Sequence, residues 1–239
     1  MISPQHSPRL AIVGNGKMGQ AVAQLAREQG LPVVVTIDAD HNVRGSGLTR
    51  SNLDGANVVV EFSTPEAAPD NIRAAVGAGL PVVAGTTGWY AELDDVSDYV
   101  REKAGALLWA PNFSLGANIW WETAARAAEL ASHISSMSAE IVETHHAAKK
   151  DRPSGTALYL QRRVATDLGY PPPVTSIRVG HVPGTHEFVL DGPFEQLRVE
   201  HLVRDRRVFA EGAIVAARWI LGRQGVFTMK DVLAREMET

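Results

Sequence analysis

The sequence contains no cysteine and no long apolar run, and no large excess of positive charge. The absence of cysteine excludes disulfides, thiolate metal ligands and cysteine nucleophiles, and it fits a reducing cytoplasm. No apolar run approaches the roughly 18 residues of a membrane-spanning helix, and the first residues lack the basic and apolar regions of a secretory signal. The net charge of −4 argues against a nucleic-acid partner. We therefore expect a cytoplasmic protein without membrane or nucleic-acid partners, whereas small anionic ligands stay possible.

The first half of the chain alternates between short apolar runs and helical stretches. Such continuous β-branched runs suit strands of a parallel sheet that is covered on both faces. The runs span residues 10–14, 33–38, 57–62, 81–85 and 106–110, and the helical stretches span 18–29, 66–78 and 90–103. This alternation predicts an α/β fold, a Rossmann-type doubly wound parallel sheet.

The pattern changes near residue 111. Two helical stretches, 117–133 and 155–168, are followed by three strand-like runs between 176 and 203, which predict a second α+β domain with a mixed sheet. The last forty residues turn helical again, at 210–221 and 230–237. We predict one domain formed by residues 1–110 and about 217–239, and a second formed by 111–216.

A glycine motif joins the first predicted strand to the first predicted helix. It comprises Gly14, Asn15, Gly16, Lys17, Met18 and Gly19. In this context the first glycine makes a tight turn, the second lets the backbone approach a pyrophosphate, and the third lets helix and strand pack closely. The motif predicts a dinucleotide site, and the alternative is a glycine-rich turn without a ligand.

Asp38, at the end of the second strand, bears on the choice of cofactor. Its distance from the glycine motif is near the roughly twenty residues expected of a ribose-binding acid. A carboxylate there favours NADH and repels the 2′-phosphate of NADPH, although Lys17 and Arg44 could offset that repulsion. NADH is therefore favoured and NADPH is possible, and the alternative for Asp38 is a solvated acid at a strand end.

Two further strand ends have the composition of ligand-binding loops. Ligands of open α/β sheets bind outside the carboxyl ends of strands. The residues at these ends are Gly85, Thr86 and Thr87 after the fourth strand, and Ala110, Pro111, Asn112 and Phe113 after the fifth. Asn112 and Ser114 could instead cap the helix that follows.

The segment ETHHAAKKDRPSGTAL, residues 143–158, collects titratable groups beside a helix start. Ser154, Gly155 and Thr156 open a helix whose first N–H groups have no internal partner and can bind a carboxylate. Lys149 can pair with an anion, and His145 titrates near neutral pH and can transfer a proton. The alternative is a solvated loop that gathers polar residues by chance.

Other histidines of the chain have weaker assignments. His146 would point away from His145 in an extended segment and could serve packing alone. His181, His186 and His201 are scattered over predicted strands, and His186 is the one that merits attention. We expect no metal, because no carboxylate or third histidine has a ligand-like spacing here.

Together these stretches resemble one family, dihydrodipicolinate reductase (4-hydroxy-tetrahydrodipicolinate reductase) of bacterial lysine and diaminopimelate synthesis. The resemblance rests on GNGKMG, VVVEFSTPEA with GTTGW, APNFSLGAN and ETHHAAKKDRPSGTA, in consistent order. It implies a Rossmann-type cofactor domain and a mixed-sheet domain for substrate binding and oligomerisation, in a homotetramer. It also implies reduction of a cyclic, unsaturated imine dicarboxylate by NADH or NADPH. The glycine loop is one residue shorter than is common in the family, with Lys17 in place of arginine.

The resemblance also implies roles for single residues. His145 corresponds to the acid/base, Lys149 to the proton donor, and His146, Gly155 and Thr156 to substrate contacts, to which we add Ser154 from the helix start. The strand-end residues 85–87 and 110–113 correspond to the nicotinamide side of the cofactor site. Two other classes stay open: a non-catalytic dinucleotide-binding sensor, and a related reductase or dehydrogenase of another amino-acid-derived imine or aldehyde.

Overall fold

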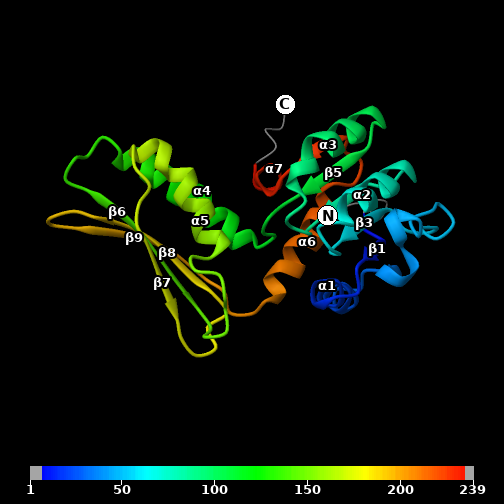
Figure 1. The fold of residues 1–239 in the computed structure, drawn as a ribbon, viewed down its shortest axis with the longest axis horizontal. Coiled ribbons are helices and arrows are strands. Elements are labelled where there is room, and N and C mark those ends of the chain that lie inside the picture. The colour runs from blue at the N-terminus through cyan, green and yellow to red at the C-terminus, as the bar shows by residue number, and fades with distance from the viewer. Residues whose placement is uncertain (1–6, 235–239) are drawn as a thin grey trace. The chain divides into compact units, whose positions relative to one another are not determined.

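A computed structural model describes residues 7–234, which divide into two compact units. The first domain runs up to Ser114 and resumes at Arg207, and the second domain is Leu115–Arg206 (Figure 1). These boundaries differ from the predicted ones, 110/111 and 216/217, for two reasons. Phe113 is buried in the first domain, and helix α6 (Arg207–Trp219) packs there against helix α1 (Lys17–Glu28). Residues 235–239 of the predicted first domain lie outside the described residues.

The first domain contains a six-stranded parallel sheet in the order β10-β5-β4-β3-β1-β2. Its strands are β1 (Leu10–Val13), β2 (Val33–Ile37), β3 (Val58–Glu61), β4 (Val82–Ala84), β5 (Ala106–Trp109) and β10 (Gly225–Phe227). The predicted doubly wound sheet is thus confirmed, and the edge strand β10 was not predicted. Because all its strands are parallel, their carboxyl ends share one edge of the sheet.

Helices cover both faces of this sheet. On one side lie α1 and α6, and on the other α2 (Ala68–Gly77) and α3 (Leu93–Glu102). The shorter elements are the 3-10 turns η2 (Ala39–His41), η3 (Val43–Gly45) and η4 (Tyr90–Glu92), and helix α7 (Met229–Leu233). The strands β1, β3 and β4 are buried along their whole length, which explains their continuous apolar runs.

The second domain is a four-stranded mixed sheet with two helices on one face (Figure 1). Its strands are β6 (Ser138–His145), β7 (Val174–Arg178), β8 (Thr185–Asp191) and β9 (Gln196–Leu202), in the order β7-β6-β8-β9. Only β6 and β7 pair in parallel. The helices α4 (Leu115–Ala131) and α5 (Gly155–Leu168) bury their alanines and tryptophans against Ile141 and Phe188. The predicted mixed sheet is confirmed.

Within the described part of the chain, no helix combines the length and apolar character needed to cross a membrane.

Candidate active site

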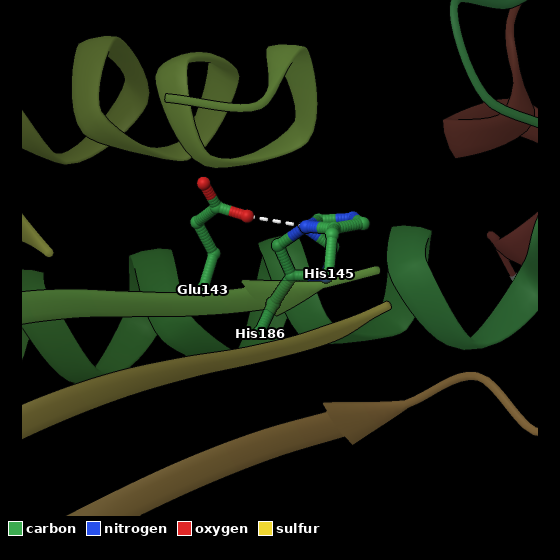
Figure 2. Close-up of side chains that lie close together, drawn as sticks. All are labelled: Glu143, His145 and His186. Carbon is green, nitrogen blue, oxygen red and sulfur yellow. Dashed lines mark hydrogen bonds and ion pairs between the residues drawn. The ribbon is translucent and has the colours of Figure 1, made fainter. Parts of the chain in front are cut away.

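Two polar side chains occupy the last inward-facing positions of β6. Side chains alternate along a strand, so Glu143 and His145 share the face that carries the core residues Ala139 and Ile141. Glu143 is fully buried and His145 is 7% exposed. The Nδ1 atom of His145 is hydrogen-bonded to Oε2 of Glu143 (Figure 2). This bond fixes the orientation of the imidazole ring.

Arg178 balances the buried charge of Glu143. It ends β7, directly opposite His145 in the parallel ladder, and its Nη2 donates to Oε1 of Glu143 at 2.7 Å. The Ser154 backbone N–H donates to the same oxygen at 3.3 Å, and Arg178 also donates to the carbonyl of Asp151 at 2.6 Å. Both carboxylate oxygens therefore have partners, as a buried charge requires. Neither Glu143 nor Arg178 was among the predicted site residues.

These contacts set the protonation of the pair. Burial raises the pKa of Glu143, but hydrogen bonds from Arg178 and His145 outweigh it and hold that pKa below its usual range. Burial lowers the pKa of His145, the charges of Lys149 and Arg178 lower it further, and Glu143 only partly opposes them. At neutral pH the carboxylate is ionised and most of the imidazole is neutral. With its Nδ1–H directed to Glu143, the ring keeps Nε2 as the atom that can accept or pass on a proton.

His186, on β8, completes the cluster. Its Nε2 lies 3.2 Å from the hydroxyl oxygen of Ser154, and its ring meets that of His145 edge-on at 5.0 Å. Burial, followed by the charge of His145, lowers the pKa of His186 to about 3, so this ring is neutral. The Ser154 hydroxyl also accepts from the N–H of Ala157 at 3.3 Å and so caps helix α5. His186 is therefore a buried, neutral hydrogen-bond partner of the residue that caps α5.

The start of α5 places backbone amides next to a cation, and the Gly155 N–H donates to the Asp151 carboxylate. Apart from its chain neighbours and its own helix, nothing lies within 4 Å of the position that a side chain on Gly155 would take, so a ligand can approach this backbone. The Nζ of Lys149 lies 2.8 Å from Oδ1 of Asp151, and its side chain is 23% exposed. Trp121 donates from Nε1 to the carbonyl of Thr156 at 3.2 Å and anchors the first turn. His146 contributes its carbonyl to a turn closed by the N–H of Lys149. An anion can thus meet both helix amides and an ammonium.

Glu143, His145 and His186 could together hold a metal ion. Each offers one ligand atom, and these atoms lie within 4.8 Å of one another (Figure 2). The spacing argument against a metal was therefore wrong, because a two-residue step puts Glu143 beside His145 and sheet pairing brings in His186. However, both oxygens of Glu143 are already hydrogen-bonded, and the guanidinium of Arg178 opposes a second cation there. A site without metal stays our prediction.

The glycine motif adopts the geometry of a dinucleotide loop. Gly14 has φ +95°, and a side chain on it would lie 2.1 Å from the carbonyl oxygen of Phe62. A side chain on Gly19 would lie 1.9 Å from the carbonyl of Gly14, so α1 packs too closely for any other residue. Gly16 is the N-cap of α1, without a side-chain cap and with open space around it. The free N-terminus of α1 therefore fits a pyrophosphate.

The other predicted cofactor residues lie at the same edge of the first sheet. Asp38 follows β2, residues 85–87 follow β4, and residues 110–113 follow β5. The Thr86 hydroxyl accepts from the N–H of Ser63 at 2.8 Å, and Asn112 Oδ1 accepts from the N–H of Ser114 at 2.8 Å. Asp38 pairs with His41 at 2.9 Å, and that hydrogen bond lowers the pKa of Asp38. This arrangement matches the strand-end rule for nucleotide sites.

A parallel dinucleotide-type sheet and a separate mixed-sheet domain with a buried acid–base cluster define a Rossmann-type oxidoreductase with two domains. The chain belongs to the dihydrodipicolinate reductase family, whose N-terminal part matches residues 8–113 and whose C-terminal part matches residues 116–233. The family predicted from the sequence is confirmed.

Similar proteins align with this chain over nearly its whole length. The chain is 32% identical to the 4-hydroxy-tetrahydrodipicolinate reductase of Christiangramia forsetii, covering 94% of this chain and 97% of the relative. It is 35% identical to the enzyme of the same name from Archaeoglobus fulgidus, covering 94% and 99%. A solved structure of dipicolinate-bound dihydrodipicolinate reductase from Paenisporosarcina sp. TG-14 shares the fold, with a TM-score of 0.75 at 19% identity over 95% of this chain and 99% of that one.

Proposed function

We propose that this chain reduces 4-hydroxy-tetrahydrodipicolinate to tetrahydrodipicolinate in lysine and diaminopimelate biosynthesis. NADH is the favoured cofactor, NADPH is possible, and the cytoplasm is the proposed location. The observation that carries the proposal is the Glu143–His145 pair beside the open start of α5 and Lys149. The names of the relatives and the dipicolinate bound to the Paenisporosarcina enzyme support a small dicarboxylate as substrate.

Binding of the dicarboxylate falls to the first turn of α5 and the segment before it. The N–H groups of Gly155 and Thr156 bind one carboxylate, because helix N-termini attract anions. When substrate binds, the ammonium of Lys149 leaves the Asp151 carboxylate and pairs with a carboxylate of the substrate. His146 lies in the adjoining turn. The buried cap at Ser154 holds these groups in place.

Proton transfer falls to His145 and Lys149. The 4-hydroxyl of the substrate leaves as water, which gives a conjugated imine. When bound, the dinucleotide supplies a hydride, and its addition to that imine leaves negative charge that must be protonated. His145 can deliver that proton from Nε2, while Glu143 stabilises the imidazolium through Nδ1. The lowered pKa of His145 makes its imidazolium a stronger acid than a free one. Lys149 is the second proton donor within the segment, and it also carries the charge that binds substrate.

We expect Lys149→Met to weaken binding and turnover together, because one group serves both. The dissociation constant for dipicolinate should rise about tenfold or more, as for loss of a hydrogen bond to a charged group, and kcat should fall as well. Calorimetric titration with dipicolinate and steady-state kinetics would measure the two effects. Lys150→Met is the matched control, because Lys150 is the exposed neighbour. Equal effects of the two substitutions would remove Lys149 from the site.

Asp38 should set the preference for NADH. In Asp38→Ser the ratio of kcat/KM for NADH to that for NADPH should fall roughly tenfold or more, because the variant loses a charge-assisted bond to ribose and the repulsion of the 2′-phosphate. Asp40→Ser is the control, since Asp40 lies exposed in the same turn. An unchanged ratio in Asp38→Ser would assign the preference to other residues.

We also propose that the chain forms a homotetramer through its second domain. The helices cover one face of the mixed sheet (Figure 1), and the opposite face exposes Ile177 (42% exposed) and Leu202 (54%). We expect Ile177→Asp to lower the assembled mass measured by light scattering after size exclusion, because a buried unpaired carboxylate opposes association. Val34→Asp, on the exposed side of β2 in the first domain, should leave the mass unchanged. The reverse pattern would contradict the proposed interface.

A further inference from the structure

A second buried acid, Glu61, lies in the first domain at the sheet edge that carries the predicted cofactor residues. It ends β3, between β1 and β4, and it is fully buried. Its Oε1 accepts from the Ser63 N–H at 3.0 Å, from the Ser63 hydroxyl, and from Asn71 Nδ2 at 3.4 Å. Its Oε2 is buried and has no hydrogen-bond partner among the described residues. Burial raises the pKa of Glu61, which favours the neutral carboxyl.

Glu61 belongs to a continuous chain of buried and half-buried hydrogen bonds, in which Asn71 Nδ2 also donates to the Ser63 hydroxyl at 3.0 Å. On one side, Oδ1 of Asn71 accepts from Asn42 Nδ2 at 2.7 Å, and Oδ1 of Asn42 accepts from the N–H of Gly47 at 3.0 Å. Asn42 directly follows η2, the turn that Asp38 caps. On the other side, the N–H of Ser63 donates to Thr86 Oγ1 at 2.8 Å. The chain therefore connects the Asp38 segment with the Thr86 segment.

We propose that Glu61, Asn71 and Asn42 are positioning residues, which hold the Asp38 and Thr86 segments in one geometry and so couple the two ends of the dinucleotide site. This inference rests on the proposed function, because it takes both segments to contact the dinucleotide. Packing supports it: a side chain on Gly45 would lie 2.8 Å from the carbonyl oxygen of Asp70 on α2, the helix of Asn71, so the loop after Asp38 lies directly on that helix. A buried polar group costs free energy unless it is hydrogen-bonded, and a network whose groups are bonded fixes one local geometry.

The coupling has a measurable signature. ADP-ribose lacks nicotinamide, so it reports the Asp38 end, the pyrophosphate and the second ribose, whereas NADH adds the nicotinamide contacts at the Thr86 end. A purely local role for Glu61 and Ser63 at Thr86 would affect NADH and spare ADP-ribose. Coupling through Asn71 requires that loss of Glu61 weaken both ligands.

The experiment measures dissociation constants for NADH and ADP-ribose on the full chain by calorimetry. We expect Glu61→Leu and Asn71→Ala each to raise both constants about tenfold, as for a buried polar group left unpaired. Glu61→Gln should recover most of the affinity lost in Glu61→Leu, because an amide resembles a neutral carboxyl. Tyr90→Phe is the control, because it removes a buried hydroxyl of this domain that lacks a hydrogen bond.

Melting temperatures and circular dichroism accompany each variant. If Glu61→Leu or Asn71→Ala does not fold, Asn42→Ala decides the question, because it breaks the chain at its far end. Unchanged NADH and ADP-ribose binding in a folded Asn71→Ala or Asn42→Ala would overturn the proposal. Binding is measured without substrate, so a wild-type chain that binds NADH but does not reduce the imine would count against the proposed function alone.

Discussion

We expect His145→Gln to lower kcat by about 10²- to 10⁴-fold, the usual contribution of a general acid, with a much smaller change in KM for the imine. Glutamine can still accept or donate one hydrogen bond near Glu143, but it cannot deliver a proton. Steady-state kinetics on the two proteins would measure the split between kcat and KM. His181→Gln is the matched control, because His181 is exposed and lies outside the cluster.

The pH dependence gives this prediction a second readout. Burial lowers the pKa of His145, so the free enzyme should titrate below 6.5. His145 must be protonated to donate, so kcat/KM should fall as pH rises through the lowered pKa of His145. This fall of kcat/KM with rising pH should be absent in His145→Gln. If kcat/KM instead rises with pH in this range, and does so in His145→Gln as well, the assigned role is contradicted.

The second large effect concerns stability. We expect Arg178→Met to lower the free energy of unfolding by about 3–5 kcal/mol, because removing one partner of a buried ion pair leaves the other charge uncompensated. Glu143 is fully buried and Arg178 Nη2 is its 2.7 Å partner. Urea unfolding followed by circular dichroism would measure the change. The double variant Glu143→Gln with Arg178→Met should recover part of the loss, because it removes both charges.

The acid side of the stability curve should change in the same variant. The folded pKa of Glu143 is lowered, so its contribution is present above the unfolded pKa and is lost as pH falls through the folded value. Without Arg178 the folded pKa rises, and the difference that drives this acid sensitivity shrinks. Equal stability of Arg178→Met and wild type at neutral pH would show that Glu143 is not held as a buried carboxylate.

Most of the first domain could be predicted because its signals are local. Continuous β-branched runs and the turn at Gly14 each reflect a backbone requirement that a few residues express. The edge strand β10 escaped prediction because Gly225–Phe227 is half-buried and contains one β-branched residue, so it lacks the continuous apolar run of the other strands. The boundary at Arg207 also escaped, because it depends on the packing of α6 against α1, which is a tertiary contact.

The candidate active site was likewise predictable only where its residues lie close together in the sequence. His145, Lys149 and the start of α5 stand in one short segment, so the sequence could point to them together. Glu143 had a signal that went unused, since strand alternation puts it on the face of His145. Arg178 and His186 come from β7 and β8, and only the pairing of those strands with β6 brings them to the cluster. No local pattern encodes such pairing.

The alternative function, a non-catalytic dinucleotide-binding sensor, requires fewer of these residues. A sensor needs the glycine loop and Asp38, but it has no use for a buried Glu143–Arg178 pair that orients His145. The described residues retain both sets. A related reductase of another imine would keep both and differ in the carboxylate contacts at Gly155 and Lys149.

The most direct test is NADH oxidation with freshly formed cyclic imine, made by condensing pyruvate with aspartate semialdehyde. The proposed mechanism predicts rapid loss of NADH absorbance that requires both precursors and that is slowed by dipicolinate. Tight NADH binding without turnover of this imine would contradict it and would leave the chain as a dinucleotide-binding protein of another purpose.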